Sequence, residues 1–240
     1  MNILRFIKIL GEFEKPVFTV NDAARILNID KEYARLYLHR LRSKGLILAA
    51  ERNKYSLSDT HPYAIASNLV FPSYISFLTA AHYYGATTQI PGTIYIASTS
   101  SKKSIDVGGY SIDFIKLKKE RFFGYSRVKF QNKFIFMAEK EKMILDSLLL
   151  PQYCPIDETI RALDDKNINV ENLIEYGIRM DSIVILKRLG FLLELKGMDV
   201  SYKFKARLNA KYDPLNPFLP RMGRKNRKWK LIINEVLENA

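Results

Sequence analysis

The segment from Lys31 to Ile47, KEYARLYLHRLRSKGLI, constrains the fold of this chain more than any other stretch. Four apolar residues recur at the spacing of one helix face and predict a buried stripe: Ala34, Tyr37, Leu38 and Leu41. Asp30 is placed to cap the helix N-terminus, and Gly45 is the residue type that ends helices in the left-handed conformation. These signals predict a capped, amphipathic helix from Lys31 to about Lys44.

The flanking segments complete an ordered set of elements. Residues 3–10 have helical apolar spacing, and a short helix ending near Asn28 is expected behind Asn21, a common N-cap residue. β-prone runs on either side of Arg52–Lys54 predict a hairpin. Helix, short helix, tight turn, helix and hairpin is the order of a winged helix-turn-helix, which we expect over residues 1–60.

The rest of the chain predicts two further segments. Residues 59–72 contain two prolines and are expected to form a linker or irregular connection. We then expect a mixed α/β domain over residues 61–195. It should contain a helix from Ser73 to Gly85, an antiparallel-leaning sheet, and helices closed by Gly190. Residues 196–240 are predicted as a basic extension with an amphipathic helix, whose apolar face is Trp229, Ile232, Ile233, Val236 and Leu237. The expected fold class is therefore α+β, with an N-terminal winged helix-turn-helix, a mixed α/β domain and a basic C-terminal helical tail.

The positive charge of the chain is concentrated at its two ends. The formal net charge is +13, with a pI near 9.6. Residues 1–60 carry 11 Lys and Arg against 7 Asp and Glu, residues 61–195 carry 16 against 14, and residues 196–240 carry 11 against 4. A basic surface concentrated in this way favours a polyanionic partner, and we expect double-stranded DNA.

Leu36 indicates how the helix at 31–44 is used. It lies opposite the predicted buried stripe, where a solvated helix would carry a polar residue but a helix in the major groove can place an aliphatic group against a thymine methyl. The N-terminal half of a recognition helix reads bases and its ends contact phosphates. We predict base contacts from Lys31, Glu32, Arg35, Leu36 and His39, and phosphate contacts from Arg40, Arg42, Lys44, Arg52 and Lys54. Tyr33 and Asn53 complete the predicted DNA-binding set, although a winged helix alone does not establish DNA binding.

The basic extension has two alternative interpretations. Its cations are candidates for a second set of phosphate contacts: Arg221, Arg224, Lys225, Arg227 and Lys228. Alternatively, its helix packs Trp229 against the body of the protein.

The sequence gives little support for a catalytic or metal site. Candidate acids do not form the Asp and Glu-x-Lys pattern of a metal-dependent nuclease: Asp106, Asp113, Glu139, Glu141 and Asp146. His39, His61 and His82 are scattered, and Gly108-Gly109 lacks the residues of a phosphate-binding loop. We therefore expect no catalytic residues, no metal and no cofactor.

The chain also lacks targeting signals. Glu12 and Glu14 interrupt the apolar N-terminus, which argues against a signal peptide, and no run approaches the roughly 20 apolar residues of a membrane helix. The single cysteine, Cys154, excludes an internal disulfide and is typical of a reducing compartment. We expect a cytoplasmic protein with no membrane partner.

Three segments, in their order and spacing, resemble the AbiEi-type antitoxins and transcriptional regulators of abortive-infection (type IV) toxin–antitoxin systems. They are YISFLTAAHYYGATTQIPGTIYIAS, MAEKEKMILDSLLLP and VILKRLGFLLE. The resemblance spans about residues 20–195, and its more specific pieces are Ala80–Pro91, Glu141-Lys142 with Ile144-Leu145-Asp146, and Arg188-Leu189-Gly190. It does not extend over residues 212–240.

The resemblance implies a transcriptional autoregulator whose N-terminal module binds repeats in its own promoter. It also implies a domain that opposes a nucleotidyltransferase-like toxin without requiring a stable complex. For the motif residues a structural role is expected, with Arg188 as a partner for Asp146. Two alternatives stay open: a nucleic-acid-processing enzyme, such as a metal-dependent nuclease delivered by the winged helix, and a ligand-sensing repressor. Monomer and homodimer are also both open.

Overall fold

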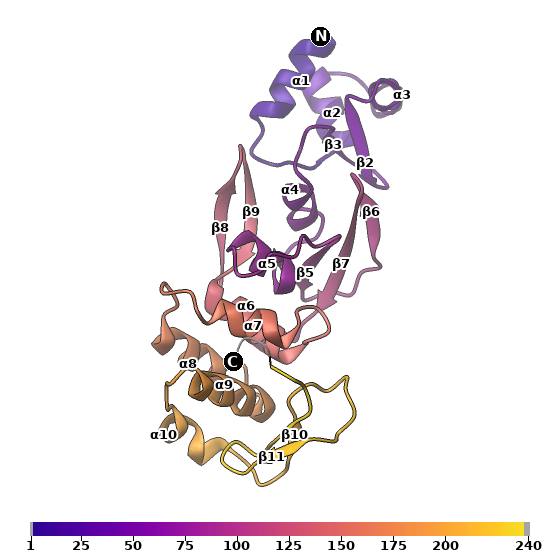
Figure 1. Ribbon diagram of the computed structural model, residues 1–240. Coiled ribbons are helices and arrows are strands. Elements are labelled where there is room, and N and C mark those ends of the chain that lie inside the picture. The colour runs from indigo at the N-terminus through magenta and orange to yellow at the C-terminus, as the bar shows by residue number, and fades with distance from the viewer. Residues whose placement is uncertain (1, 238–240) are drawn as a thin grey trace. The chain divides into compact units, whose positions relative to one another are not determined.

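The computed structural model describes residues 2–237 and shows a mixed α+β protein (Figure 1). The chain divides into two compact units. Among the described residues, the first contains 2–75, 92–116 and 126–137, and the second contains 76–91, 117–125 and 138–237. This division differs from the three predicted segments, because the first unit combines the predicted N-terminal domain with most of the following sheet. Within residues 2–237, no helix is both long and apolar enough to cross a membrane.

The first unit begins with three helices and a three-stranded antiparallel sheet of order β1-β3-β2. The elements are α1 (Ile3–Glu12), β1 (Phe18–Thr19), α2 (Val20–Leu27), α3 (Lys31–Ser43), β2 (Ile47–Glu51) and β3 (Lys54–Leu57). Their shared core includes Phe6, Phe18, Ala34, Leu38 and Leu41. Apolar residues at helical spacing therefore converge on one core, as the sequence predicted.

The N-terminus of α2 differs from the prediction. Thr19, not Asn21, is the N-cap, because its hydroxyl accepts a hydrogen bond from the Asp22 amide at 3.2 Å. The Asp22 carboxylate in turn accepts from the Thr19 amide at 2.8 Å, which completes a capping box. Two backbone donors are satisfied reciprocally in this way, so the helix begins earlier than expected.

A six-stranded mixed sheet forms the rest of the first unit, in the order β6-β7-β5-β4-β9-β8. Its strands are β4 (Ser73–Ile75), β5 (Thr93–Ser98), β6 (Ile105–Val107), β7 (Tyr110–Lys116), β8 (Tyr125–Phe130) and β9 (Lys133–Ala138). The pairs β5–β7 and β4–β9 are parallel, whereas β4–β5 and β6–β7 are antiparallel. The sheet is therefore mixed, whereas the sequence predicted an antiparallel-leaning sheet.

The stretch predicted as a linker is part of the folded core. Residues Pro62–Ser67 form a short helix, α4, with Tyr63, Ala64, Ile65 and Ala66 buried. Ser73–Ile75, predicted as the start of a helix, is strand β4 instead. Both errors have one cause: contacts with distant strands decide the structure of residues 59–75. Pro62 is the first residue of α4, a position where proline is compatible with a helix.

The second unit is mainly helical and ends in a small sheet. Its helices are α5 (Phe77–Tyr83), α6 (Lys140–Leu149), α7 (Ile156–Ala162), α8 (Val170–Arg179), α9 (Ile183–Leu195) and α10 (Ser201–Phe204), with single 3-10 turns at Lys119–Arg121 and Lys205–Arg207. The sheet has the order β10-β12-β11, formed by β10 (Asp213–Pro214), β11 (Arg224–Asn226) and β12 (Leu231–Ile233). Most side chains of α6 and α9 are buried, so these two helices form the centre of the unit.

The predicted amphipathic helix at the C-terminus is wrong, because Leu231–Ile233 is a strand. Leu231 pairs with Asp213 and Ile232 with Pro214 on β10, while β11 pairs on the other side. The apolar residues were spaced for a helix, but long-range strand pairing prevails over this local pattern. Trp229 precedes the strand and is completely buried.

Gly190 explains how Trp229 is accommodated. It was predicted to end a helix, yet α9 continues through it to Leu195. A β-carbon at this position would come within 2.1 Å of the Trp229 ring, so only glycine leaves room for the indole. The glycine is therefore a packing residue inside a helix.

Candidate nucleic-acid interface

Helix α3 has the caps and the faces that its sequence predicted. The Tyr33 amide donates to Asp30 Oδ1 at 2.8 Å, and Gly45 adopts a left-handed φ of +68° beyond the last turn. Leu38 and Leu41 are buried on one side. The helix is thus fixed by its own caps and by the core beneath it.

The opposite face of α3 is exposed and combines cations with one aliphatic side chain. Leu36 is 57% exposed, and Arg35 beside it is also exposed. Arg35 forms an ion pair with Glu32 one turn earlier. Both partners are largely in solvent, where such pairs contribute roughly 0–1 kcal/mol, so the guanidinium can exchange this carboxylate for another acceptor at little cost.

The β2–β3 hairpin is anchored to the body of the first unit. Asn53 occupies the turn with φ +62°, and its Oδ1 accepts from the Val20 amide at 3.3 Å. Lys54 donates to the Leu69 carbonyl and lies 3.1 Å from the Glu51 carboxylate. Lys54 therefore contributes to holding the hairpin, and its predicted phosphate contact stays a prediction. The Asn53 side chain likewise has a structural bond.

Helix α3 and the hairpin together line an open groove of about 680 Å³. Six of the predicted residues meet there: Glu32, Arg35, Leu36, His39, Arg52 and Asn53. Val20 and Tyr55 also line it, and neither is among the residues predicted from the sequence. Tyr55 lies on a strand just after the turn, and this position in the sequence could have indicated that it faces the groove. No sequence signal indicated the same for Val20. Five predicted residues lie exposed on α3 outside the groove: Lys31, Tyr33, Arg40, Arg42 and Lys44.

The predicted tail cations are exposed in the second unit, on a folded segment and not on an extended arm. Arg224 and Lys225 lie on β11, and Arg227 follows it. Lys228 is 2.6 Å from Glu194, and Arg221 donates to the Tyr212 carbonyl at 2.8 Å. The Lys225 ammonium lies 5.4 Å from the centroid of the Tyr212 ring, so three of the five cations have partners within the protein.

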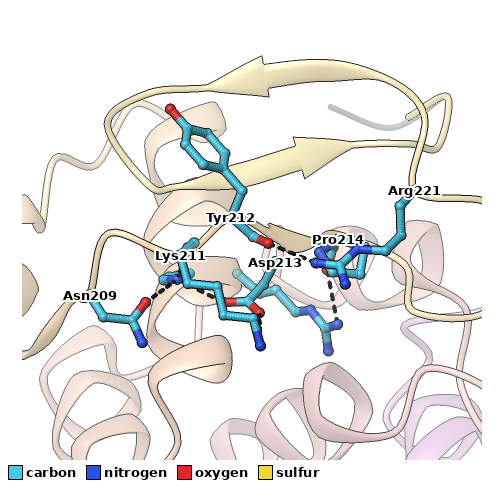
Figure 2. A network of polar contacts seen from close by, with 8 residues as sticks. Asn209, Lys211, Tyr212, Asp213, Pro214 and Arg221 are labelled. Atoms are coloured by element: carbon cyan, nitrogen blue, oxygen red, sulfur yellow. Dashed lines mark hydrogen bonds and ion pairs between the residues drawn. The ribbon is translucent and has the colours of Figure 1, made fainter.

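A buried polar network anchors this C-terminal segment. The Lys187 ammonium donates to Asn209 Oδ1 and to Asp213 Oδ2, each at 2.7 Å; Figure 2 labels both acceptor residues. Arg188 donates to the Leu148 carbonyl at 2.6 Å and to the Pro214 carbonyl at 3.0 Å. Burial lowers the pKa of Arg188 to about 10, partly offset by the charge of Asp213.

The expected partnership of Arg188 with Asp146 is not found. Asp146 instead forms a buried ion pair with Lys142 on α6, and the Ser76 hydroxyl donates to its Oδ2 at 2.8 Å. Burial lowers the pKa of Lys142, although the neighbouring carboxylate opposes the shift. An ion pair four residues apart on one helix satisfies both groups locally, which leaves Arg188 for backbone carbonyls.

Three of the five candidate acids of a nuclease, Glu139, Glu141 and Asp146, take part in structural bonds. Glu139 accepts from the Tyr176 hydroxyl at 2.8 Å, and Glu141 accepts from the Asn169 amide at 2.7 Å. Among residues 2–237, no three His, Cys, Asp or Glu side chains gather as a set that could hold a metal ion.

The chain is similar in fold to a solved protein. A crystal structure of the RV2827C protein from Mycobacterium tuberculosis superimposes with a TM-score of 0.67, over 95% of this chain and 90% of that chain. The sequences are 14% identical, so this likeness concerns the fold alone. No family model matches the chain, and no curated protein matches its sequence.

Proposed function

We propose that this protein binds double-stranded DNA through its N-terminal residues. Helices α1 to α3 and the β2–β3 hairpin follow the order of a winged helix-turn-helix, with α3 as the recognition helix and the hairpin as the wing. Arg35 and Leu36 would face base edges in the major groove. Arg40, Arg42, Lys44 and Arg52 would contact phosphates on either side.

One observation carries this proposal: an exposed leucine and two arginines line the groove that α3 and the hairpin share. Leu36 and Arg35 come from the helix and Arg52 from the hairpin. An exposed aliphatic group is unfavourable in water but suits contact with a thymine methyl. Within the described residues Arg52 has no ion pair, which leaves its charge available to a phosphate.

The test is binding to the DNA upstream of the protein's own gene, measured by footprinting and by fluorescence anisotropy over a salt series. Arg35→Ala is expected to weaken specific binding by roughly 1–3 kcal/mol and to relax the sequence preference. Lys8→Gln is the control, because Lys8 is an exposed cation on α1 outside the groove. Equal affinities for specific and random DNA, or an equal loss in both variants, would contradict the assignment of α3.

We further propose that the DNA-bound protein is a transcriptional autoregulator and an antitoxin against a nucleotidyltransferase-like toxin. This part rests on the resemblance of the segments within residues 74–194 to AbiEi-type antitoxins. The test is co-expression with a neighbouring nucleotidyltransferase-like gene and a reporter under the native promoter. Growth rescue and promoter repression would support it; a toxic neighbour that this protein fails to neutralise would refute the antitoxin role.

A further inference from the structure

A second groove, of about 510 Å³, lies in the first unit and shares no residue with the groove of α3. Its walls come from the loop after α1, the segment between α4 and β4, and the strands β8 and β9. The lining residues are Glu14, Lys15, Ser67, Asn68, Val70, Phe71, Arg127, Phe134 and Phe136. A concave site with mostly apolar walls and a few polar groups is the usual form of a small-molecule site.

Three of the nine lining residues are phenylalanines: Phe71, Phe134 and Phe136. Phe71 is 81% exposed, although its ring centroid lies 6.1 Å from that of Phe136. The Arg127 guanidinium lies 3.7 Å from the centroid of the Phe134 ring. The exposed Phe71 ring and the neighbouring Phe136 ring offer edge and face contacts to a planar molecule, and such contacts would remove apolar surface from water.

The groove is also lined by charged side chains. Arg127 and Lys15 oppose the single carboxylate of Glu14, and Arg127 Nη2 lies 2.8 Å from Glu14 Oε2. This pair is exposed and therefore weak. A ligand carboxylate can replace Glu14 on the guanidinium, and a planar fork of donors matches a carboxylate in two hydrogen bonds. The lining carries two cations and one carboxylate, so its net charge of +1 favours a ligand with a single negative charge.

The walls of this groove are bonded to the hairpin that borders α3. Lys54 on β3 donates to the carbonyl of Leu69, which lies in the chain between the lining residues Asn68 and Val70. The loop containing Glu14 and Lys15 leads into β1, which pairs with β3. Movement of either wall therefore acts on the hairpin directly, through one hydrogen bond and one strand pair.

We propose that this groove binds a planar aromatic molecule with one carboxylate, and that binding changes the affinity of α3 and the hairpin for DNA. The ring lies against Phe71 and Phe136, and the carboxylate lies on Arg127 in place of Glu14. The effect on DNA rests on the proposed function, whereas ligand binding does not. Coupling between two sites of this kind is commonly 5- to 150-fold.

The probe is 2-naphthoate, titrated into the full chain by calorimetry and by ligand-observed NMR. Cyclohexanecarboxylate retains the charge without the planar ring, and 2-naphthamide retains the ring without the charge, so both should bind at least about tenfold more weakly. Arg127→Gln and Phe71→Ala should each reduce naphthoate affinity by about the same factor. Lys129→Gln and Phe218→Ala are matched controls, because both side chains are exposed and neither lines the groove.

The second measurement is DNA affinity with and without saturating 2-naphthoate. We expect a change of at least about fivefold in the wild type, and no change in Phe71→Ala. Three results would overturn the proposal: no probe binding by the wild type at millimolar concentration, binding insensitive to both groove variants, or binding that leaves DNA affinity unaltered. If the wild type binds no DNA at all, the proposed function fails, and the probe titration still decides the site by itself.

Discussion

Replacing Gly190 with alanine tests the closest packing contact in the second unit. A β-carbon there would lie 2.1, 2.2 and 2.6 Å from three atoms of the Trp229 ring. Carbon atoms pack at about 3.5–4.0 Å, so the ring would have to withdraw by more than about 1 Å. The indole is poorly placed to do so, because it is buried, its Nε1 donates to Glu194, and its backbone amide donates to Asn226 Oδ1 at 2.9 Å.

The loss in the free energy of unfolding depends on whether the Trp229 ring leaves its pocket. If Trp229 leaves its pocket, the loss approaches that of a Trp→Ala substitution, about 3–5 kcal/mol. Alanine returns about 1 kcal/mol through its better helix propensity, so we expect Gly190→Ala to lower the free energy of unfolding by about 2–4 kcal/mol. If the surroundings yielded instead, overpacking would cost about 1–3 kcal/mol before the same return.

Urea unfolding followed by circular dichroism and by fluorescence gives this value, and Trp229 is the sole tryptophan of the chain. Its native emission should shift to the red in the variant. Gly11→Ala is the matched control, because Gly11 also lies in a helix but a β-carbon there meets no atom within 4 Å. That variant should be unchanged or stabilised by up to about 1 kcal/mol. A Gly190→Ala protein as stable as the wild type, with unaltered emission, would refute the packing argument.

Three further measurements test other parts of the structure. Arg52→Gln should reduce the slope of log affinity for DNA against log salt concentration by about 0.9. Lys54→Gln should leave this slope unchanged, because Lys54 already donates to the Leu69 carbonyl. Equal slopes in both variants would contradict this distinction. Burial raises the pKa of the Cys154 thiol to about 11, so Ellman's reagent at pH 8 should react only after unfolding, and rapid native labelling would refute its burial. His61 Nδ1 accepts from the Tyr63 amide at 3.1 Å, and burial lowers the histidine pKa below 6.5. The stability contributed by neutral His61 is therefore complete above pH 6.5 and is lost as the pH falls through the folded-state pKa. The Tm of the wild type should fall more between pH 7 and pH 5 than the Tm of His61→Asn. Equal falls in Tm would contradict this.

The candidate site was predictable where local chemistry decides the structure. Asp30, Gly45 and the spacing of Ala34, Leu38 and Leu41 define α3 within a single segment, and they also place Leu36 outward. A capping box between Thr19 and Asp22 was equally visible in the sequence, but Asn21 is also a good cap residue and competed with it. Sequence reasoning thus located the exposed face of α3 correctly.

Features that depend on distant partners could not be read from the sequence. Lys54 looks like any other hairpin cation until the carbonyl of Leu69 is seen beside it. Ile232 has helical spacing from Trp229, yet it pairs with Pro214 as a strand. Gly190 resembles a helix terminator because the indole that requires it lies far along the chain. In each case a contact between remote segments outweighs the local preference.

The ammonium group of Lys133 on β9 holds the end of α1. It donates to the carbonyl of Gly11 at 2.7 Å and to that of Phe13 at 2.6 Å, where a helix leaves carbonyls without internal partners. The N-terminal helices and the strands β8 and β9 are thus coupled parts of one folding unit, although 120 residues of sequence separate Phe13 from Lys133. A chimera that carries only residues 1–60 on another protein would lack the hydrogen bonds from Lys133 to the end of α1. A fragment that keeps these bonds must also include β8 and β9.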